Sequence, residues 1–123
     1  MKRPIHEADF DWEIHAKGTA QELRAKALCD VGGRAKIGVG LLELPPSCDT
    51  KPAHWHSLEE EHLYVLDGRA TLHLGPYSCE LRAGSYVCVP ANQEFAHFLE
   101  NTGVEPFRYL MIGERIAGDE VHR

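Results

Sequence analysis

Residues 52–68 read PAHWHSLEEEHLYVLDG, and this stretch decides how the rest of the chain is interpreted. It holds three potential metal ligands close together, His54, His56 and Glu61. It ends in Asp67-Gly68, a pair that favours a tight turn between two antiparallel strands. The stretch therefore predicts a hairpin that carries metal ligands.

The spacing of the three ligands predicts where the chain turns. Side chains alternate along a strand, so His54 and His56 point the same way, about 7 Å apart, and both can bind one ion. Glu61 has the opposite parity from His56, so the chain must turn within residues 57–60 before the next strand begins. A ligand from a distant strand would complete the shell, and His97, inside an apolar run, is the candidate.

The ligand types favour a metal but do not choose it. A mixed set of histidines and a carboxylate suits Fe, Mn, Ni, Co, Zn or Cu. Four protein ligands on an octahedral ion leave two open positions, as in catalytic or ligand-binding sites, whereas structural zinc more often uses Cys. Taken singly, the histidines are more often surface or core residues, and residues 59–61 are more often a solvated turn. Their combination at these positions favours a divalent metal site.

The rest of the chain predicts a single all-β domain over residues 1–123. Short apolar segments alternate with turn signals at near-regular spacing, which favours a sandwich or barrel, and no strand–helix alternation is present. The expected strands cover residues 36–44, 53–57, 61–66, 70–74, 78–82, 86–89, 95–101 and 107–112.

The two ends of the chain are less regular. We expect N-terminal strands within residues 10–30 and a loose polar tail over 114–123. Residues 19–28, TAQELRAKAL, have two interpretations. Thr19 and Glu22 form a helix-capping pattern, but apolar residues also alternate with polar ones as in a strand. The strand is preferred because the rest of the chain predicts strands.

Composition excludes several classes of function. The chain has 13 basic and 19 acidic residues, a net charge of -6 and no basic patch, so nucleic acid is not expected as a partner. No apolar run could span a membrane and no secretory signal is present, so we expect a cytoplasmic protein without a membrane partner. The four cysteines form no CxxC pair, and we interpret them as reduced thiols.

Two motifs resemble those of the cupin superfamily. The first covers residues 54–68 with the spacing HxH, four residues, Glu, six residues, Gly. The second covers residues 84–101 with the spacing Gly, five residues, Pro, six residues, His, three residues, Asn. The resemblance implies a small single-domain bacterial cupin: a jelly-roll (double-stranded β-helix) barrel over about 36–113 that binds one metal through His54, His56, Glu61 and His97. It also implies a homodimer, since small cupins often exchange N-terminal strands.

Two positions depart from the cupin motifs without touching a ligand. Cys48 stands where a glycine is expected before the first histidine, and Asn92 stands where one is expected after Pro90. Asn is the non-glycine residue best able to adopt a left-handed conformation, so the backbone there can be kept. The interval from Pro90 to His97 is two residues longer than the strict motif, a variant common among small bacterial cupins.

Function is narrowed to two classes. Cupins include dioxygenases, sugar-phosphate isomerases, oxalate decarboxylases and sugar-binding domains, so the fold does not give the substrate. One expectation is a metal-dependent enzyme, an oxidoreductase or isomerase of dioxygenase, isomerase or decarboxylase type, acting on a small oxygen-rich substrate. Weak acid–base candidates are Tyr64, Cys88 and Tyr109, while His73 is expected to point outward. The alternative is a non-catalytic module that binds or senses a sugar or carboxylate through the metal, and a metal-free barrel is the plainest interpretation.

Overall fold

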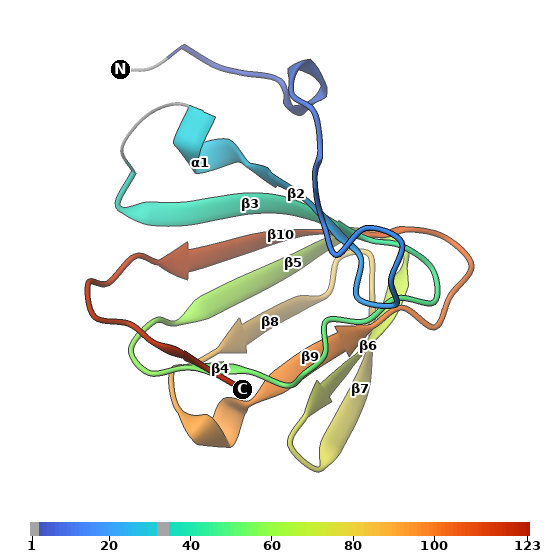
Figure 1. Cartoon of the computed structure of the whole chain (residues 1–123), viewed down its shortest axis with the longest axis vertical. Helices are drawn as coiled ribbons and strands as arrows, with labels where there is room; N and C mark the ends of the chain where they lie inside the picture. The colour runs from blue at the N-terminus through green and yellow to red at the C-terminus, as the bar shows by residue number, and fades with distance from the viewer. Residues whose placement is uncertain (1–2, 32–34) are drawn as a thin grey trace.

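Antiparallel strands dominate the computed structural model, which describes residues 3–31 and 35–123. Figure 1 shows two curved sheets. The larger has the strand order β1-β2-β3-β10-β5-β8 and the smaller has the order β7-β6-β9, while β4 pairs with β11. Because β10 lies between β3 and β5, strands distant in the sequence become neighbours, as in a jelly roll. The all-β jelly-roll prediction is confirmed.

The elements have the following bounds. The strands are β1 Glu13–His15, β2 Leu23–Ala27, β3 Ile37–Leu44, β4 Trp55–His56, β5 Glu61–Asp67, β6 Arg69–Leu74, β7 Tyr77–Arg82, β8 Tyr86–Val89, β9 His97–Glu100, β10 Phe107–Glu114 and β11 Val121–His122. The helices are η1 Glu7–Asp9, α1 Leu28–Val31 and η2 Gln93–Phe95. Within the described residues, no helix has the length and apolarity needed to cross a membrane.

The core lies between the two sheets and takes alternate residues from their strands. On β5, Leu63 and Val65 are buried whereas Tyr64 and Leu66 are exposed, which is the period of two expected of a strand with one covered face. Leu72 of β6 belongs to the same buried cluster. A shift of register by one residue would expose this face, so burial fixes which side chains of β5 point inward.

The helical alternative for residues 19–28 is wrong. β2 is a strand from Leu23 to Ala27, and Leu28 opens the single turn α1. The capping pattern serves a turn instead, because the Thr19 hydroxyl donates to a carbonyl three residues earlier and Glu22 accepts from the Gly18 amide, at 2.7 and 2.8 Å. β2 pairs with both β1 and β3, and this pairing holds the segment as a strand rather than a helix.

The C-terminal residues are not the loose tail that we expected. Glu114 ends β10, the chain turns at Gly118 with φ +88°, and β11 then pairs with β4. The rings of Trp55 and His122 stack with centroids 4.2 Å apart. The chain end therefore becomes the partner of the strand that carries the HxH motif (Figure 1).

The two departures from the cupin motifs are accommodated by the backbone. Asn92 has φ +129°, a conformation glycine adopts more readily, and its side chain accepts from the Gln93 amide at 2.6 Å. Next to Cys48, the positive φ falls on Ser47, at +65°, and the Cys48 side chain is buried in the core cluster. Neither substitution disturbs the strands that follow.

Gly68, the turn residue that ends the first motif, should be intolerant of a side chain. Its φ is +85°, and a Cβ there would overlap the carbonyl oxygen of Pro106. Gly84 has a similar φ of +89° but open space around it. Gly84→Ala should lower the free energy of unfolding by about 1–2 kcal/mol through backbone conformation alone. Gly68→Ala should cost about 1–3 kcal/mol more through overlap. Equal losses in urea denaturation would contradict this account.

Candidate metal centre

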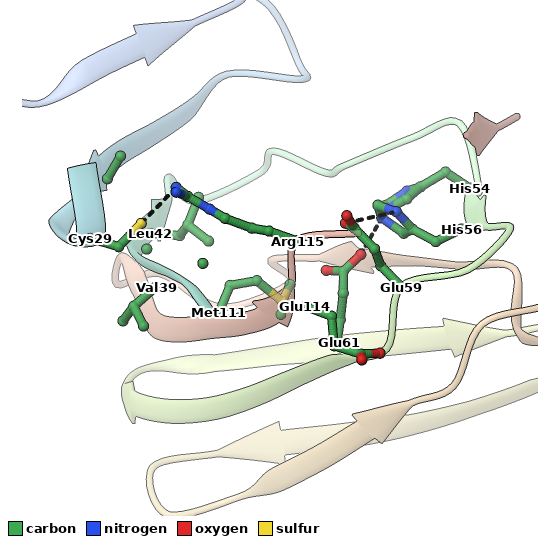
Figure 2. A pocket seen from close by; sticks show the side chains of 14 residues that line it. Cys29, Val39, Leu42, His54, His56, Glu59, Glu61, Met111, Glu114 and Arg115 are labelled. Atoms are coloured by element: carbon green, nitrogen blue, oxygen red, sulfur yellow. Dashed lines mark hydrogen bonds and ion pairs between the residues drawn. The ribbon is translucent and has the colours of Figure 1, made fainter. Parts of the chain in front are cut away.

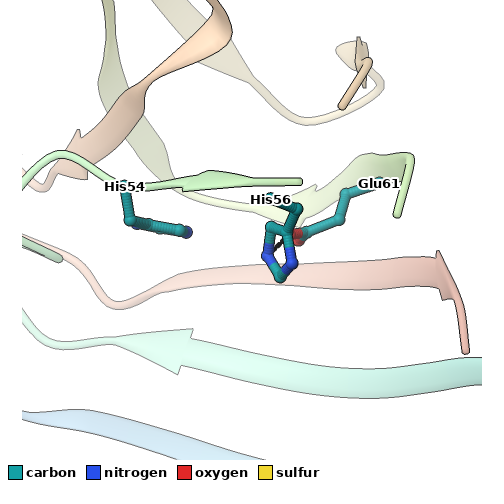
Figure 3. A group of neighbouring side chains, drawn as sticks. All are labelled: His54, His56 and Glu61. Carbon is teal, nitrogen blue, oxygen red and sulfur yellow. Dashed lines mark ion pairs between the residues drawn. The ribbon is translucent and has the colours of Figure 1, made fainter. Parts of the chain in front are cut away.

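Three side chains beside β4 and β5 converge on one point (Figure 3). One ligand atom from each of His54, His56 and Glu61 lies within 4.8 Å of the others. His56 belongs to β4 and Glu61 opens β5, so the chain does turn between them, as their parity requires. The two strands do not form the expected hairpin, because β4 pairs with β11 whereas β5 pairs with β10 and β8. The structure thus brings together three of the four ligands expected from the sequence.

His97, the fourth expected ligand, lies beside His54 but outside this group of three. The two residues exchange backbone hydrogen bonds of 3.1 and 3.0 Å, and their ring centroids are 4.6 Å apart. The Nδ1 of His97 donates to the Phe95 carbonyl at 2.9 Å, which leaves Nε2 as the ring's lone-pair nitrogen. His97 is 5% exposed. Its ring is therefore oriented and buried in the form that can bind a metal.

The ring of His54 is kept neutral by its surroundings. Burial lowers the pKa of His54 to about 4, and the neighbouring His97 and His56 rings add to the effect. A metal binds the neutral imidazole, so this environment removes competition from protons near neutral pH.

Asp119 fixes the orientation of His56. The Nδ1 of His56 lies 2.8 Å from Oδ2 of Asp119, and because a carboxylate accepts, Nδ1 carries the proton and the lone pair lies on Nε2. Burial alone raises the pKa of Asp119, but hydrogen bonds from His56 and from the Leu58 and Glu59 amides outweigh it and hold that pKa below its usual value. The carboxylate is therefore charged when it meets the imidazole.

Contact between His56 and Glu61 indicates what the site binds. Nε2 of His56 and Oε1 of Glu61 lie directly against each other, and Oε1 is buried without a hydrogen bond from the described residues. When His56 is neutral with its proton on Nδ1, two lone pairs face each other in a place shielded from water, which is unfavourable. A second proton on the imidazole would relieve this contact, by making His56 a cation that donates to Glu61. A divalent cation between them satisfies both atoms. The residues present therefore fit a metal ion of the kind that histidine and carboxylate ligands select.

An open cavity of about 400 Å³ begins at this group. Figure 2 shows His54, His56 and Glu59 at one end and Cys29 with Arg115 at the other. Apolar side chains of β3 and β10 lie between them. A second, narrower cavity of about 140 Å³ also contacts His54 and additionally His97. The metal group is thus reached from outside by a space of small-molecule size.

The structure places the three weak acid–base candidates away from the open cavity. Tyr64 and Cys88 lie on the outer face of the larger sheet, where Cys88 is close to Glu60 and His62. Both ring nitrogens of His62 are already hydrogen-bonded there. Tyr109 is buried and lines only the narrower cavity, and burial followed by the charge of Glu61 raises its pKa. None of them lines the open cavity, although Tyr109 shares the narrower one with His54, Glu61 and His97.

Sequence reasoning missed three residues near the site: Glu59, Arg115 and Asp119. Residues 59–61 resembled a solvated turn, yet Glu59 lines the open cavity and its Oε2 accepts from the Ile116 amide at 2.7 Å. Arg115 and Asp119 belong to the segment expected to be loose. The turn at Gly118-Asp119 was a possible local signal, but nothing in it indicated that the chain returns to β4.

The chain belongs to the cupin family. The family's cupin-domain profile matches residues 40–113, which include both motifs and all four expected ligands. A search of curated protein sequences gave no match.

Solved structures share the fold. One from Acidithiobacillus ferrooxidans, described as "Putative sugar phosphate isomerase", is 30% identical with a TM-score of 0.79, covering 90% of this chain and 70% of the other. The polyketide cyclase RemF from Streptomyces resistomycificus is 23% identical with a TM-score of 0.84, covering 100% and 85%. A "predicted oxalate decarboxylase" from Thermotoga maritima is 20% identical with a TM-score of 0.78, covering 93% and 100%. The latter two similarities bear on fold alone.

Removal of His56 should abolish metal binding. His56→Ala, purified without a His tag, should hold less than about a tenth of an equivalent, because the remaining ligands cannot close the site. His73→Ala is the control: His73 contacts Glu100 at 3.4 Å and stacks on Phe98, on the outer face of the smaller sheet. It should keep the wild-type metal content. Equal loss in both variants by elemental analysis would refute the ligand assignment.

Proposed function

We propose that this chain is a metal-dependent cupin enzyme that moves a proton on a small, oxygen-rich, anionic substrate, as isomerases do. The observation that carries the proposal is the open cavity, which joins the His54–His56–Glu61 group at one end to Arg115 at the other. A binding pocket with a metal group and a cation at opposite ends can hold a small molecule at two points.

His97 is proposed as the fourth ligand of the ion. Three observations support this. His97 lies beside His54, its Nδ1–H donates to a carbonyl and so leaves Nε2 as acceptor, and it lines the narrow cavity together with Glu61. A divalent ion bound by these four residues would supply a Lewis acid that polarises a substrate carbonyl group.

Glu59 is proposed as the general base. Its Oε2 is held by the Ile116 amide, while its Oε1 lies 3.9 Å from Nδ1 of His56 and the side chain lines the cavity (Figure 2). A carboxylate fixed through one oxygen can take a proton from a substrate carbon with the other and return it to the neighbouring carbon, while the hydroxyl proton passes from one substrate oxygen to the other. Such a transfer needs no oxidant, which distinguishes it from the dioxygenase alternative.

Arg115 is proposed to hold the anionic group of the substrate. Its guanidinium lies at the far end of the cavity, where it pairs with Asp30 and contacts Cys29. Glu59 and Glu114 also line this cavity, so the arginine and the metal ion are needed to offset their charge. Similarity to the protein described as a sugar phosphate isomerase is consistent with a phosphorylated substrate.

Glu59→Gln should separate catalysis from binding. The glutamine can still accept from the Ile116 amide but cannot take a proton, so kcat should fall roughly 10²–10⁴-fold with metal content unchanged. The measurement is deuterium incorporation from D₂O, by NMR, into aldose and ketose phosphates and hydroxy acids incubated with protein loaded with each candidate metal. Glu80→Gln, an exposed position on β7, is the matched control and should behave as wild type.

Parallel readings of O₂ consumption and CO₂ release identify the other chemistries. Oxygen uptake or decarboxylation without deuterium incorporation would replace the isomerase proposal with a dioxygenase or a decarboxylase.

A non-catalytic binding or sensor module is the second candidate. The carboxylates around the cavity favour it. Glu59 and Glu114 each already accept a backbone amide hydrogen bond, which fits a role in structure rather than in proton transfer. Metal-dependent binding of a sugar or carboxylate by calorimetry, with no turnover for any metal, would support this candidate against the enzyme.

We also propose that the chain forms a homodimer through the outer face of the larger sheet. Tyr64 and Tyr86 are paired across β5 and β8 there and are 44% and 60% exposed. Tyr64→Glu should lower the mass measured by light scattering toward the monomer value of 13.8 kDa. Tyr77→Glu, 75% exposed on β7, should leave a dimer intact. A wild-type monomer would contradict the proposal.

A further inference from the structure

We propose that Asp119 is a positioning residue of the metal centre, which holds His56 in the tautomer that presents Nε2 to the ion. The inference rests on the proposed metal site and adds to it a residue from the far end of the chain. Asp119 does not itself line the open cavity, and it acts on the site through His56, which does.

Both oxygens of Asp119 are committed. Oδ2 lies 2.8 Å from Nδ1 of His56, and Oδ1 accepts the amides of Leu58 and Glu59 at 2.8 and 2.9 Å. The side chain is only 8% exposed. The carboxylate therefore cannot rotate away from His56 without leaving two backbone amides unpaired.

The segment that carries Asp119 is itself held against β4. Ser57 and Glu120 exchange two hydrogen bonds, of 2.9 Å through the backbone and 2.8 Å through the serine hydroxyl. Val121 pairs with His56 in the β4–β11 register. The same turn that separates His56 from Glu61 is thus closed by the chain end.

Glu59 does not replace Asp119 in this role. Its nearest oxygen is 3.9 Å from Nδ1 of His56, beyond hydrogen-bond distance, against 2.8 Å for Asp119. The imidazole therefore donates to Asp119. Carboxylates that accept from a ligand histidine fix the ring and its tautomer, and their loss typically weakens metal binding 10–100-fold.

The asparagine variant tests this chemistry because the two backbone amides orient it. In Asp119→Asn, the side-chain oxygen must face the Leu58 and Glu59 amides, so the NH₂ group faces Nδ1 of His56. A donor opposite Nδ1 favours the tautomer protonated on Nε2, where the ion would bind. Reversing the amide instead would set its NH₂ against two N–H donors.

Two measurements are made on wild-type protein and on Asp119→Asn. The ¹⁵N signals of His56 in metal-free protein at mildly alkaline pH should show the proton on Nδ1 in wild type and on Nε2 in the variant. Competition with a chelator should show Zn²⁺ and Mn²⁺ affinity roughly 10–100-fold lower in the variant. Glu120→Gln is the control: this neighbouring side chain pairs with His122 and should leave both readouts unchanged.

The outcomes separate this inference from the proposed function. Wild-type affinity in a folded Asp119→Asn protein, or a wild-type His56 protonated on Nε2, would overturn the role of Asp119. The wild-type tautomer is informative even if the variant does not fold. A wild-type protein that binds neither metal would overturn the metal centre itself, whatever the tautomer.

Discussion

A single buried contact, between Nε2 of His56 and Oε1 of Glu61, constrains the whole site. Both atoms present lone pairs when His56 is neutral, and Oε1 has no other hydrogen-bond donor in the described part of the chain. An uncompensated buried carboxylate is costly, so the contact requires a positive charge, supplied by a bound metal ion or by a second proton on His56. The rest of the structure holds these two atoms together: the turn after β4, the start of β5 and the returning C-terminal segment.

Strand pairing holds the two sides of that contact in place. β5 is paired on both sides, with β10 and with β8, so Glu61 projects from one of the best-supported strands of the molecule. β4 has only two residues and little pairing of its own. It depends on β11 and on the exchange of hydrogen bonds between His54 and His97. The two halves of the ligand group therefore differ in how they are stabilised, and the histidine half relies on distant segments.

Local pattern predicted much of this from the sequence. Every strand expected between residues 36 and 112 is present with ends within two residues, because alternation and turn chemistry are local properties. The ligands His54, His56 and Glu61 could be found for the same reason, since one short stretch of sequence carries all three. The hairpin predicted for that stretch is wrong, because β4 and β5 belong to different sheets. The capping pattern at Thr19 failed because pairing of β2 with β3 outweighs a local hydrogen bond. Glu59 looked like a solvated turn because its burial comes from residues after β10.

Asp119 could not be found from local sequence patterns, and it makes the site depend on a distant segment of the chain. It lies 63 residues from His56, and the intervening chain forms six strands, so no local spacing could connect the two. His54, His56 and Glu61 lie close together in the sequence, on β4, on β5 and beside them. Orientation of His56 additionally requires the residues after β10, which turn back at Gly118 and bring Asp119 to the ring. Ligand identity is therefore encoded locally, whereas the metal-binding form of His56 depends on completion of the whole fold.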